Sequence, residues 1–257
     1  MAIHKNSLTE ISYDLIGDER SNRTLLCIHG AGGNMEALRA LAEQFPDYKC
    51  ILMDLPGHNL SGGAEPKSVS DFVTVIEKFI QSEKKLLGGN ITCIGHSMGG
   101  CISMELALRK IPEIRQLIIL NSGANITLNS NFMKKVRNGK IDKIYLYKCS
   151  GSYLHPRVLM FFLKSFKQMI KSQSVMIKDF LIVENYDLRN NVKNITLPTL
   201  IITGEKEILA LPEYSKYLHS QIKGSQLFIM KKVAHLMPIV VPEKLSVHIR
   251  DFLNKNK

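Results

Sequence analysis

The strongest constraint in this sequence comes from five short runs that are apolar at nearly every position. A strand with one face in water alternates apolar and polar residues, whereas a strand covered on both faces reads as an almost unbroken apolar run. Such strands are typical of parallel sheets with helices on both sides. The runs are TLLCI at 24–28, CILMDL at 50–55, ITCIG at 91–95, LIIL at 117–120 and TLIIT at 199–203. Two further strands are expected within EISYDLI at 10–16 and SQLFIMKKV at 225–233.

Amphipathic helical patterns fall between these strands. The stretch 34–45 repeats apolar side chains on one helix face, namely Leu38, Leu41, Ala42 and Phe45. Ser70 is the expected N-cap of a helix over 70–80, and further helices are expected over 99–110, 211–222 and 242–255. Strands that alternate with helices predict an α/β fold with a mostly parallel, doubly wound sheet.

The alternation stops between residues 121 and 195, where helical patterns follow one another with no buried strand between them. We expect a helical cap there, inserted into a core made of 1–120 and 196–257, and the length of 257 residues suits that organisation. One cap helix, over 155–171, is amphipathic. Its expected apolar face carries Leu159, Phe162, Leu163, Phe166 and Ile170, and its basic face carries Arg157, Lys164, Lys167 and Lys171.

The positive charge of the chain is concentrated in the same segment. The formal net charge is +11, and residues 121–193 alone hold thirteen Lys and Arg against four Asp and Glu. Such an excess indicates a solvated basic surface, an anionic substrate or an anionic lipid surface. The sequence lacks the residue pattern of a nucleic-acid-binding motif, so we expect no nucleic-acid partner.

A serine occupies the point where one buried run ends and a helical pattern begins. GHSMG has the spacing G-x-S-x-G at Gly95, Ser97 and Gly99. In a strand-to-helix turn this tight, the serine backbone is strained, its neighbours must be small, and its hydroxyl is exposed above the sheet. The pattern predicts that Ser97 is a nucleophile.

A serine hydroxyl needs a base within hydrogen-bond reach, and the base needs an acid to orient it. Of the eight histidines, His235 alone begins a loop directly after the last strand, so it is the expected base. In chain order the acid should lie between serine and histidine. Glu207, just past the strand ending at Gly204, is the expected acid, with Glu205 as the main alternative and Asp54 as a weaker one.

The tetrahedral intermediate of acyl transfer needs two preorganised N–H donors. The backbone amide of Met98 is one candidate, and the amide of Ala31 in the loop HGAGG at 29–33 is the other. The same reasoning places Gly30 and His96 beside the substrate. Leu159 and Phe162 of the cap are the expected apolar contacts.

HGAGGN lacks the full dinucleotide-binding spacing and the chain has no phosphate-binding loop motif. No cofactor and no metal are expected.

Taken together, these motifs resemble those of the α/β-hydrolase superfamily. The similarity runs through HGAGG, DLPGHNLSGG at 54–63, GHSMGG, GEKEILALP and VAHLMP. The resemblance implies that Asp54 and His58 brace a loop near the site. One departure is that Glu207 stands where the superfamily usually has aspartate, so its longer side chain must retract to meet the histidine.

The resemblance implies a hydrolase that cleaves a small carboxylic ester or thioester through an acyl-enzyme on Ser97. Two alternatives remain: a lyase or C–C hydrolase acting on a carboxylated metabolite, and a weakly catalytic ligand sensor. Contact of the basic cap helix with a membrane surface is a further hypothesis. The oligomeric state is not predicted.

The sequence also bears on where the protein works. MAIHKNSLTEISYDL lacks the apolar run of a secretory signal peptide, and no stretch approaches the length of a bilayer span. The five cysteines have neither zinc-ligand nor disulfide-framework spacing. A reducing cytoplasm is therefore the expected compartment.

Overall fold

The chain folds around one eight-stranded sheet, seen in the computed structural model that describes residues 4–151, 155–160 and 173–256. The strands follow the order β1-β2-β4-β3-β5-β6-β7-β8 across the sheet. They span His4–Lys5 (β1), Ser12–Gly17 (β2), Thr24–Ile28 (β3), Lys49–Met53 (β4), Ile91–His96 (β5), Ile114–Leu120 (β6), Thr199–Gly204 (β7) and Gln226–Met230 (β8). Each expected strand is present, and the mostly parallel α/β fold is confirmed.

Strand direction divides the sheet into two parts. From β4 to β8 every neighbouring pair runs parallel, whereas β2 pairs antiparallel with β4 and with β1. The sequence did not predict β1, because two residues carry no periodic pattern. Because its strands run in the same direction, the parallel part brings their carboxyl ends, and the loops that follow them, to one edge of the sheet.

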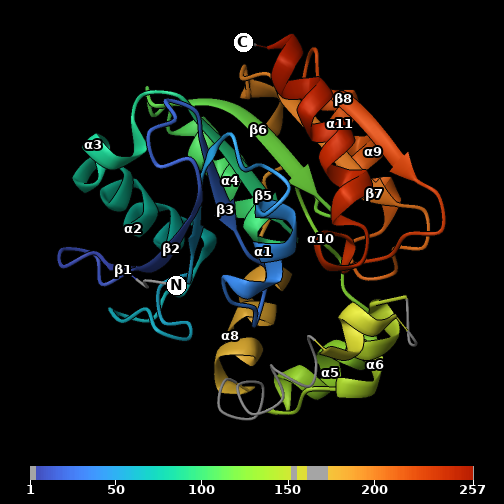
Figure 1. The fold of residues 1–257 in the computed structure, drawn as a ribbon. Helices are drawn as coiled ribbons and strands as arrows, with labels where there is room; N and C mark the ends of the chain where they lie inside the picture. The colour runs from blue at the N-terminus through green and yellow to red at the C-terminus, as the bar shows by residue number, and fades with distance from the viewer. Residues whose placement is uncertain (1–3, 152–154, 161–172, 257) are drawn as a thin grey trace.

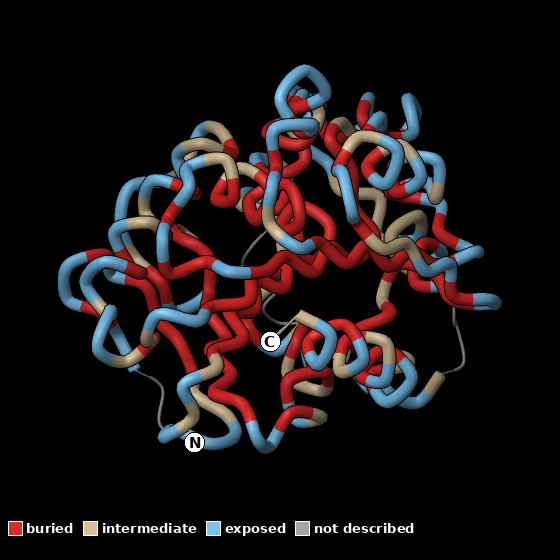
Figure 2. Tube along the Cα trace, turned by 90° about the horizontal axis from the view of Figure 1, so that it is seen from above, coloured by how far each residue is buried: buried red, intermediate tan, exposed pale blue. Residues whose placement is uncertain are grey.

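Both faces of the parallel part are covered, which explains the unbroken apolar runs. Along β3, Leu25 and Cys27 join one core cluster, while Leu26 and Ile28 join the other. Helices α1, α10 and α11 supply the first cluster, and α2, α4 and α9 contribute to the second (Figure 1). Figure 2 shows a central layer of mostly buried chain with coils above and below it that carry most of the exposed residues.

The helices largely match the expected ranges, with differences at their ends. They span Glu36–Ala42 (α1), Val69–Ser82 (α2), Lys84–Leu87 (α3), Met98–Leu108 (α4), Pro212–Gln221 (α9), Met237–Val240 (α10) and Pro242–Lys255 (α11). The predicted N-cap Ser70 is wrong. Ser68 has the extended backbone of an N-cap, and its hydroxyl accepts the amide of Asp71. The four-residue helices α3 and α10 were not predicted.

Between β6 and β7 the described residues form helices and irregular segments. The helices are Ser130–Arg137 (α5), Lys143–Cys149 (α6) and Gln173–Glu184 (α8), residues 156–160 are helical, and a 3-10 turn covers Val192–Asn194. β6 runs toward the side of the molecule where α5, α6 and α8 lie (Figure 1). The division into a core and a cap at residues 121 and 195 stays a prediction. Phe162 and most of the proposed amphipathic helix lie outside the described residues.

The order of the strands creates a switch point beside β3. The connection from β3 passes through α1 to β4 on one side, while β5 lies on the other side and continues through α4. Because α1 and α4 lie on opposite faces, the loops after β3 and β5 diverge at the carboxyl ends of these strands. Ligands of open α/β sheets bind at such points.

The first turn of α4 lies very close to the end of β3, and Gly99 permits this approach. A Cβ at Gly99 would overlap the carbonyl oxygen of Ile28 and come within 2.7 Å of that of His29. Both obstacles are buried backbone atoms, one in the last residue of β3 and one in the residue after it, and they cannot move aside cheaply.

We therefore expect Gly99→Ala to lower the free energy of unfolding by about 3 kcal/mol, since overpacking a rigid contact costs this much. Gly89→Ala is the matched control, because a Cβ there meets nothing within 4 Å. The control should shift stability by less than about 1 kcal/mol. Urea unfolding of both variants is the measurement, and equal midpoints would contradict the packing account.

Candidate active site

Ser97 lies in a strained turn between β5 and α4. Its backbone angles are φ 55° and ψ −121°, which non-glycine residues seldom adopt and which cost energy to maintain. Its amide donates to the carbonyl of Leu120 at 2.9 Å, so β6 helps to hold the turn. Ser97 is 9% exposed. The tight strand-to-helix turn expected of G-x-S-x-G is therefore present, but Ser97 is buried, whereas the pattern predicted an exposed hydroxyl.

The loop after β3 packs directly against Ser97. A Cβ at Gly30 would lie 2.9 Å from the Cβ of Ser97 and 3.2 Å from the carbonyl oxygen of His96. The loop turns back at this point, because the amide of Gly33 donates to the carbonyl of Gly30 at 3.0 Å. Ala31 lies within this turn, one residue beyond the contact with Ser97.

Met98, the other expected oxyanion donor, is the first residue of α4 and is buried. The first amides of a helix have no partner inside the helix and attract negative charge. The two candidate amides thus belong to the residue after Ser97 and to the loop packed on Ser97. Their role as an oxyanion hole stays a prediction.

His235 and Glu207 form a buried pair. Nδ1 of His235 lies 2.7 Å from Oε2 of Glu207, and Glu207 is 3% exposed. The other carboxylate oxygen, Oε1, accepts the amides of Leu209 at 2.7 Å and Ala210 at 3.1 Å. Because the carboxylate faces Nδ1, the proton of a neutral His235 sits on Nδ1 and leaves Nε2 unprotonated.

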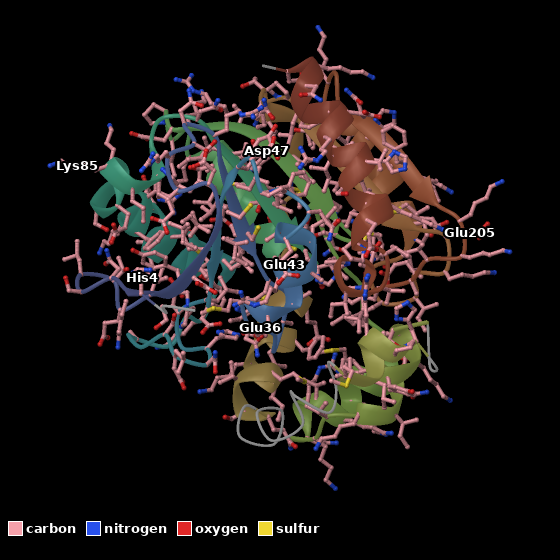
Figure 3. All side chains as sticks on the ribbon, viewed as in Figure 1. His4, Glu36, Glu43, Asp47, Lys85 and Glu205 are labelled. Carbon is pink, nitrogen blue, oxygen red and sulfur yellow. The ribbon has the colours of Figure 1, made fainter. Side chains whose placement is uncertain are left out.

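The two rival carboxylates are engaged elsewhere. Glu205 is exposed, it accepts the amide of Lys232 at 3.0 Å, and Figure 3 shows it at the periphery of the molecule. Asp54 is buried, where Oδ1 accepts the amide of Met35 and Oδ2 accepts the Asn59 amide group. Burial raises the pKa of the Asp54 carboxyl. Neither group is hydrogen-bonded to His235.

Two other buried histidines beside the turn are fixed as neutral hydrogen-bonding groups. Nε2 of His96 lies 2.8 Å from the carbonyl oxygen of His235 and must donate to it, and burial lowers the pKa of His96 to about 3. Nε2 of His29 accepts the amide of Leu55 while Nδ1 faces the carbonyl of Gly30. Burial also lowers the pKa of His29 well below its ordinary value. His96, expected to contact substrate, thus supports the main chain of His235.

Asn121 is a site residue that the sequence analysis missed. It follows β6 with φ 45°, a conformation that asparagine tolerates better than most residues, and it is fully buried. Its Nδ2 donates to the carbonyls of Ala234 and His235, each at 3.0 Å, and its Oδ1 accepts the amide of Gly204 at 2.9 Å. It joins the ends of β6 and β7 to the loop of His235. A polar residue directly after a buried strand was the available signal.

The segment between β6 and β7 also contacts the loop of His235. The amide of His235 donates to the carbonyl of Cys149 in α6 at 3.2 Å. Cys149 is buried, and burial raises the pKa of its thiol to about 12. The thiol is therefore protonated at neutral pH and behaves as a packing group.

The expected substrate contacts of the cap are only partly described. Leu159 is 52% exposed, and Phe162 lies outside the described residues, as do Lys164, Lys167 and Lys171. Several basic residues of the segment are already neutralised by carboxylates. These ion pairs are Lys135–Asp142, Arg137–Glu184, Arg157–Glu243, Lys178–Glu65 and Arg189–Asp187. They leave fewer free charges for an anion than the sequence count suggests.

Across residues 4–151, 155–160 and 173–256, no group of three or more His, Cys, Asp or Glu side chains has a metal-binding arrangement. None of the helices in these ranges combines the length and the apolar character that a bilayer span requires.

A mostly parallel α/β sheet with a serine at its central strand-to-helix turn defines the α/β class of hydrolases. Comparison with known proteins agrees. Residues 23–147 match the sequence profile of the α/β hydrolase fold family. The chain is also similar to a lipase-esterase related protein of Clostridium acetobutylicum, with 33% identity, a TM-score of 0.89, and coverage of 95% of this chain and 99% of that one. The chain belongs to the α/β-hydrolase family, and it is a hydrolase enzyme.

Curated relatives extend along most of the chain. One is the pimeloyl-(acyl-carrier protein) methyl ester esterase of Nitrosospira multiformis, 26% identical over 83% of this chain and 86% of the relative. Another is the proline iminopeptidase of Saccharolobus solfataricus, 24% identical over 95% of this chain and 89% of the relative. Their names cover different reactions, so the family alone does not fix the substrate.

The role of Asn121 can be tested by Asn121→Ala. The change leaves the buried amide of Gly204 unpaired and puts alanine at a positive φ, so we expect a loss of about 2–3 kcal/mol in stability. Because the main chain of His235 loses one of its anchors, turnover should also fall, by about tenfold. Urea unfolding and ester hydrolysis are the measurements. Asn185→Ala, an exposed change, is the control, and equal behaviour of the two variants would contradict this role.

Proposed function

We propose that this enzyme hydrolyses carboxylic esters or thioesters, with Ser97 as nucleophile, His235 as base and Glu207 as the orienting acid. The observation that carries the proposal is the buried pair of Glu207 and His235, with 2.7 Å between Oε2 and Nδ1. The strained turn of Ser97 supports the proposal. The Ser97 amide donates a hydrogen bond to Leu120, and the next residue, Asn121, donates one to the carbonyl of His235. Relatives named as esterases favour the same reaction.

Acylation begins when Oγ of Ser97 attacks the carbonyl carbon of the ester. The hydroxyl proton passes to Nε2 of His235, and the negative charge moves to the carbonyl oxygen. The amides of Met98 and Ala31 stabilise this oxygen. As the intermediate collapses, the ester C–O bond, or C–S bond, breaks and the leaving group takes the proton from Nε2. The acyl group remains on Ser97.

Deacylation repeats these steps with water. Nε2 of His235 takes a proton from water while the hydroxide attacks the acyl carbon. The second intermediate collapses, the proton returns to Oγ of Ser97, and the carboxylic acid leaves. Protons and charge balance over the two steps with no other reactant.

Glu207 stabilises the imidazolium that forms twice in each cycle. Its carboxylate is held by the amides of Leu209 and Ala210, so it need not reorganise when His235 becomes charged. These two amides also account for the use of glutamate where relatives of this architecture usually have aspartate. They fix the longer side chain in the position that reaches Nδ1.

In this proposal the segment 121–195 is the cap that covers the active site. Support comes from the hydrogen bond between the His235 amide and Cys149 of α6. An apolar acyl portion suits the apolar residues expected there. An anionic portion of the substrate remains a hypothesis based on the excess of basic residues in the segment.

Hydrolysis of p-nitrophenyl butyrate by matched variants tests the assignment. Ser97→Ala and Glu207→Gln should each lower kcat/KM by about 10³-fold or more, because they remove the nucleophile or the acceptor that fixes the histidine tautomer. Glu205→Gln is the control, since Glu205 is exposed and bonded to Lys232, and it should stay within about twofold of wild type.

A panel of esters, thioesters, amides and carboxylated metabolites without an ester bond then decides the reaction. The proposal predicts that esters or thioesters are the best substrates. Turnover of a carboxylated metabolite alone would favour a lyase or C–C hydrolase. Labelling of Ser97 by a fluorophosphonate without multiple turnover of any substrate would favour a ligand sensor. Loss of activity in Glu205→Gln instead of Glu207→Gln would contradict the assigned acid.

A further inference from the structure

Asp179 of α8 is a buried carboxylate that the sequence analysis did not single out. It is 2% exposed, and one oxygen, Oδ2, takes part in two contacts. Oδ2 accepts the amide of Gly32, in the loop packed against Ser97, at 2.6 Å. The same oxygen lies 2.8 Å from Nε2 of His58, which follows β4. Three segments distant in the chain therefore meet at one atom.

When Asp179 is ionised, His58 carries a positive charge in this arrangement. Its Nδ1 lies 3.1 Å from the carbonyl oxygen of Pro56, which can only accept a hydrogen bond, and its Nε2 faces the carboxylate of Asp179. Both ring nitrogens therefore donate, and a doubly protonated imidazole is a cation. Burial opposes this charge most strongly, but the hydrogen bond and charge of Asp179, the carbonyl of Pro56 and the charge of Asp54 together outweigh it, so the pKa of His58 lies above its ordinary value.

The loop of Gly32 is shaped for contact with α8. Gly32 has φ 61°, and a Cβ there would lie 2.6 Å from Cγ of Met176, one helical turn before Asp179. The backbone alone fits, and its amide reaches the carboxylate. Because Gly33 also bonds back to Gly30, the peptide between Ala31 and Gly32 is held from both sides.

We propose that Asp179 is a positioning residue for the oxyanion hole. By accepting the amide of Gly32, it fixes the turn that carries the amide of Ala31, and His58 neutralises the buried charge. The inference rests on the proposed function, since it takes Ala31 as an oxyanion donor. In this proposal α8 helps to stabilise the tetrahedral intermediate, in addition to any role in covering the active site.

The energetics favour such an arrangement. An oxyanion donor is effective because it is already in place when charge develops, and removal of one donor costs about 10²–10³ in kcat. A turn of three glycines around Ala31 has little rigidity of its own. A buried, charge-assisted hydrogen bond supplies that rigidity, since such bonds are shorter and stronger than neutral ones.

Two substitutions distinguish the role of Asp179 as a hydrogen-bond acceptor for Gly32 from the role of its negative charge. Asp179→Ala removes the acceptor, and we expect kcat for p-nitrophenyl butyrate to fall about tenfold or more while KM changes less than about threefold. The rate of phosphonylation of Ser97 by a fluorophosphonate should fall in parallel. Asp179→Asn removes the charge but can keep an amide oxygen at the position of Oδ2, where it accepts the amide of Gly32, so kcat should stay within about threefold of wild type.

Val183→Ala is the matched control for loosening of α8. Val183 is buried one turn beyond Asp179, and its truncation should lower stability while kcat stays unchanged. Exchange of the Gly32 amide with solvent should be slow in the wild type. This last measurement decides the question even if Asp179→Ala does not fold, because fast exchange would overturn the proposal.

A pH series gives an independent readout of the ion pair. His58 is faced by Asp179 of α8, by Asp54 after β4, by His29 after β3 and by Phe72 of α2, and the Glu65–Lys178 ion pair lies nearby. A raised pKa stabilises the fold fully below the unfolded value of about 6.5 and loses this contribution as pH rises through the folded value. The stability difference between wild type and Asp179→Asn should therefore shrink from pH 6 to pH 9.

Several results would overturn the inference. They are a wild-type kcat in Asp179→Ala, an equal loss of kcat in Val183→Ala, a loss in Asp179→Asn as large as in Asp179→Ala, or a stability difference that does not depend on pH. Failure of the proposed function has a different signature. In that case Ser97→Ala would leave the wild-type hydrolysis unchanged, whatever the behaviour of the Asp179 variants.

Discussion

The strained backbone of Ser97 is the constraint on which the rest of the structure depends. A residue with φ 55° and ψ −121° at the start of a helix persists only when its surroundings hold it. Here the holding groups are the carbonyl of Leu120 and the close packing of α4 on β3 at Gly99. These contacts exist because parallel, doubly covered strands end at a common edge. The buried sheet thus provides the energy that keeps the backbone of Ser97 in this conformation.

Polar groups at this edge are buried and connected to one another. The end of β6 contributes Asn121, which binds the loop of His235, and the end of β7 leads to Glu207, whose second oxygen is fixed by backbone amides. A buried polar network is costly when a member lacks its partner and rigid when all are paired. In this one the carboxylate of Glu207 faces Nδ1 of His235 and so fixes the tautomer of the neutral ring. The contact between Asp179 and Gly32 is a further buried polar contact at this edge, and it involves α8.

Most of the sheet and the principal residues of the candidate site could be predicted from the sequence. Buried strands, the G-x-S-x-G turn and the helix at 242–255 have local patterns, because burial and chain geometry act on neighbouring residues. Asn121 and Asp179 have no such pattern. Their partners lie more than a hundred residues away or consist of backbone atoms, so only the folded chain reveals them. The choice between Glu205 and Glu207 is of the same kind, since two residues after one strand differ only in where the turn points them.

The central claim is that Ser97 carries the acyl group during turnover. Rapid acid quenching of the wild-type enzyme with p-nitrophenyl butyrate, followed by peptide mass spectrometry, tests it most directly. The account predicts a butyryl adduct on the peptide that contains Ser97, formed at the rate of p-nitrophenol release, and no adduct when His235 is replaced by alanine. An adduct on another residue, or turnover without any covalent intermediate, would contradict the account.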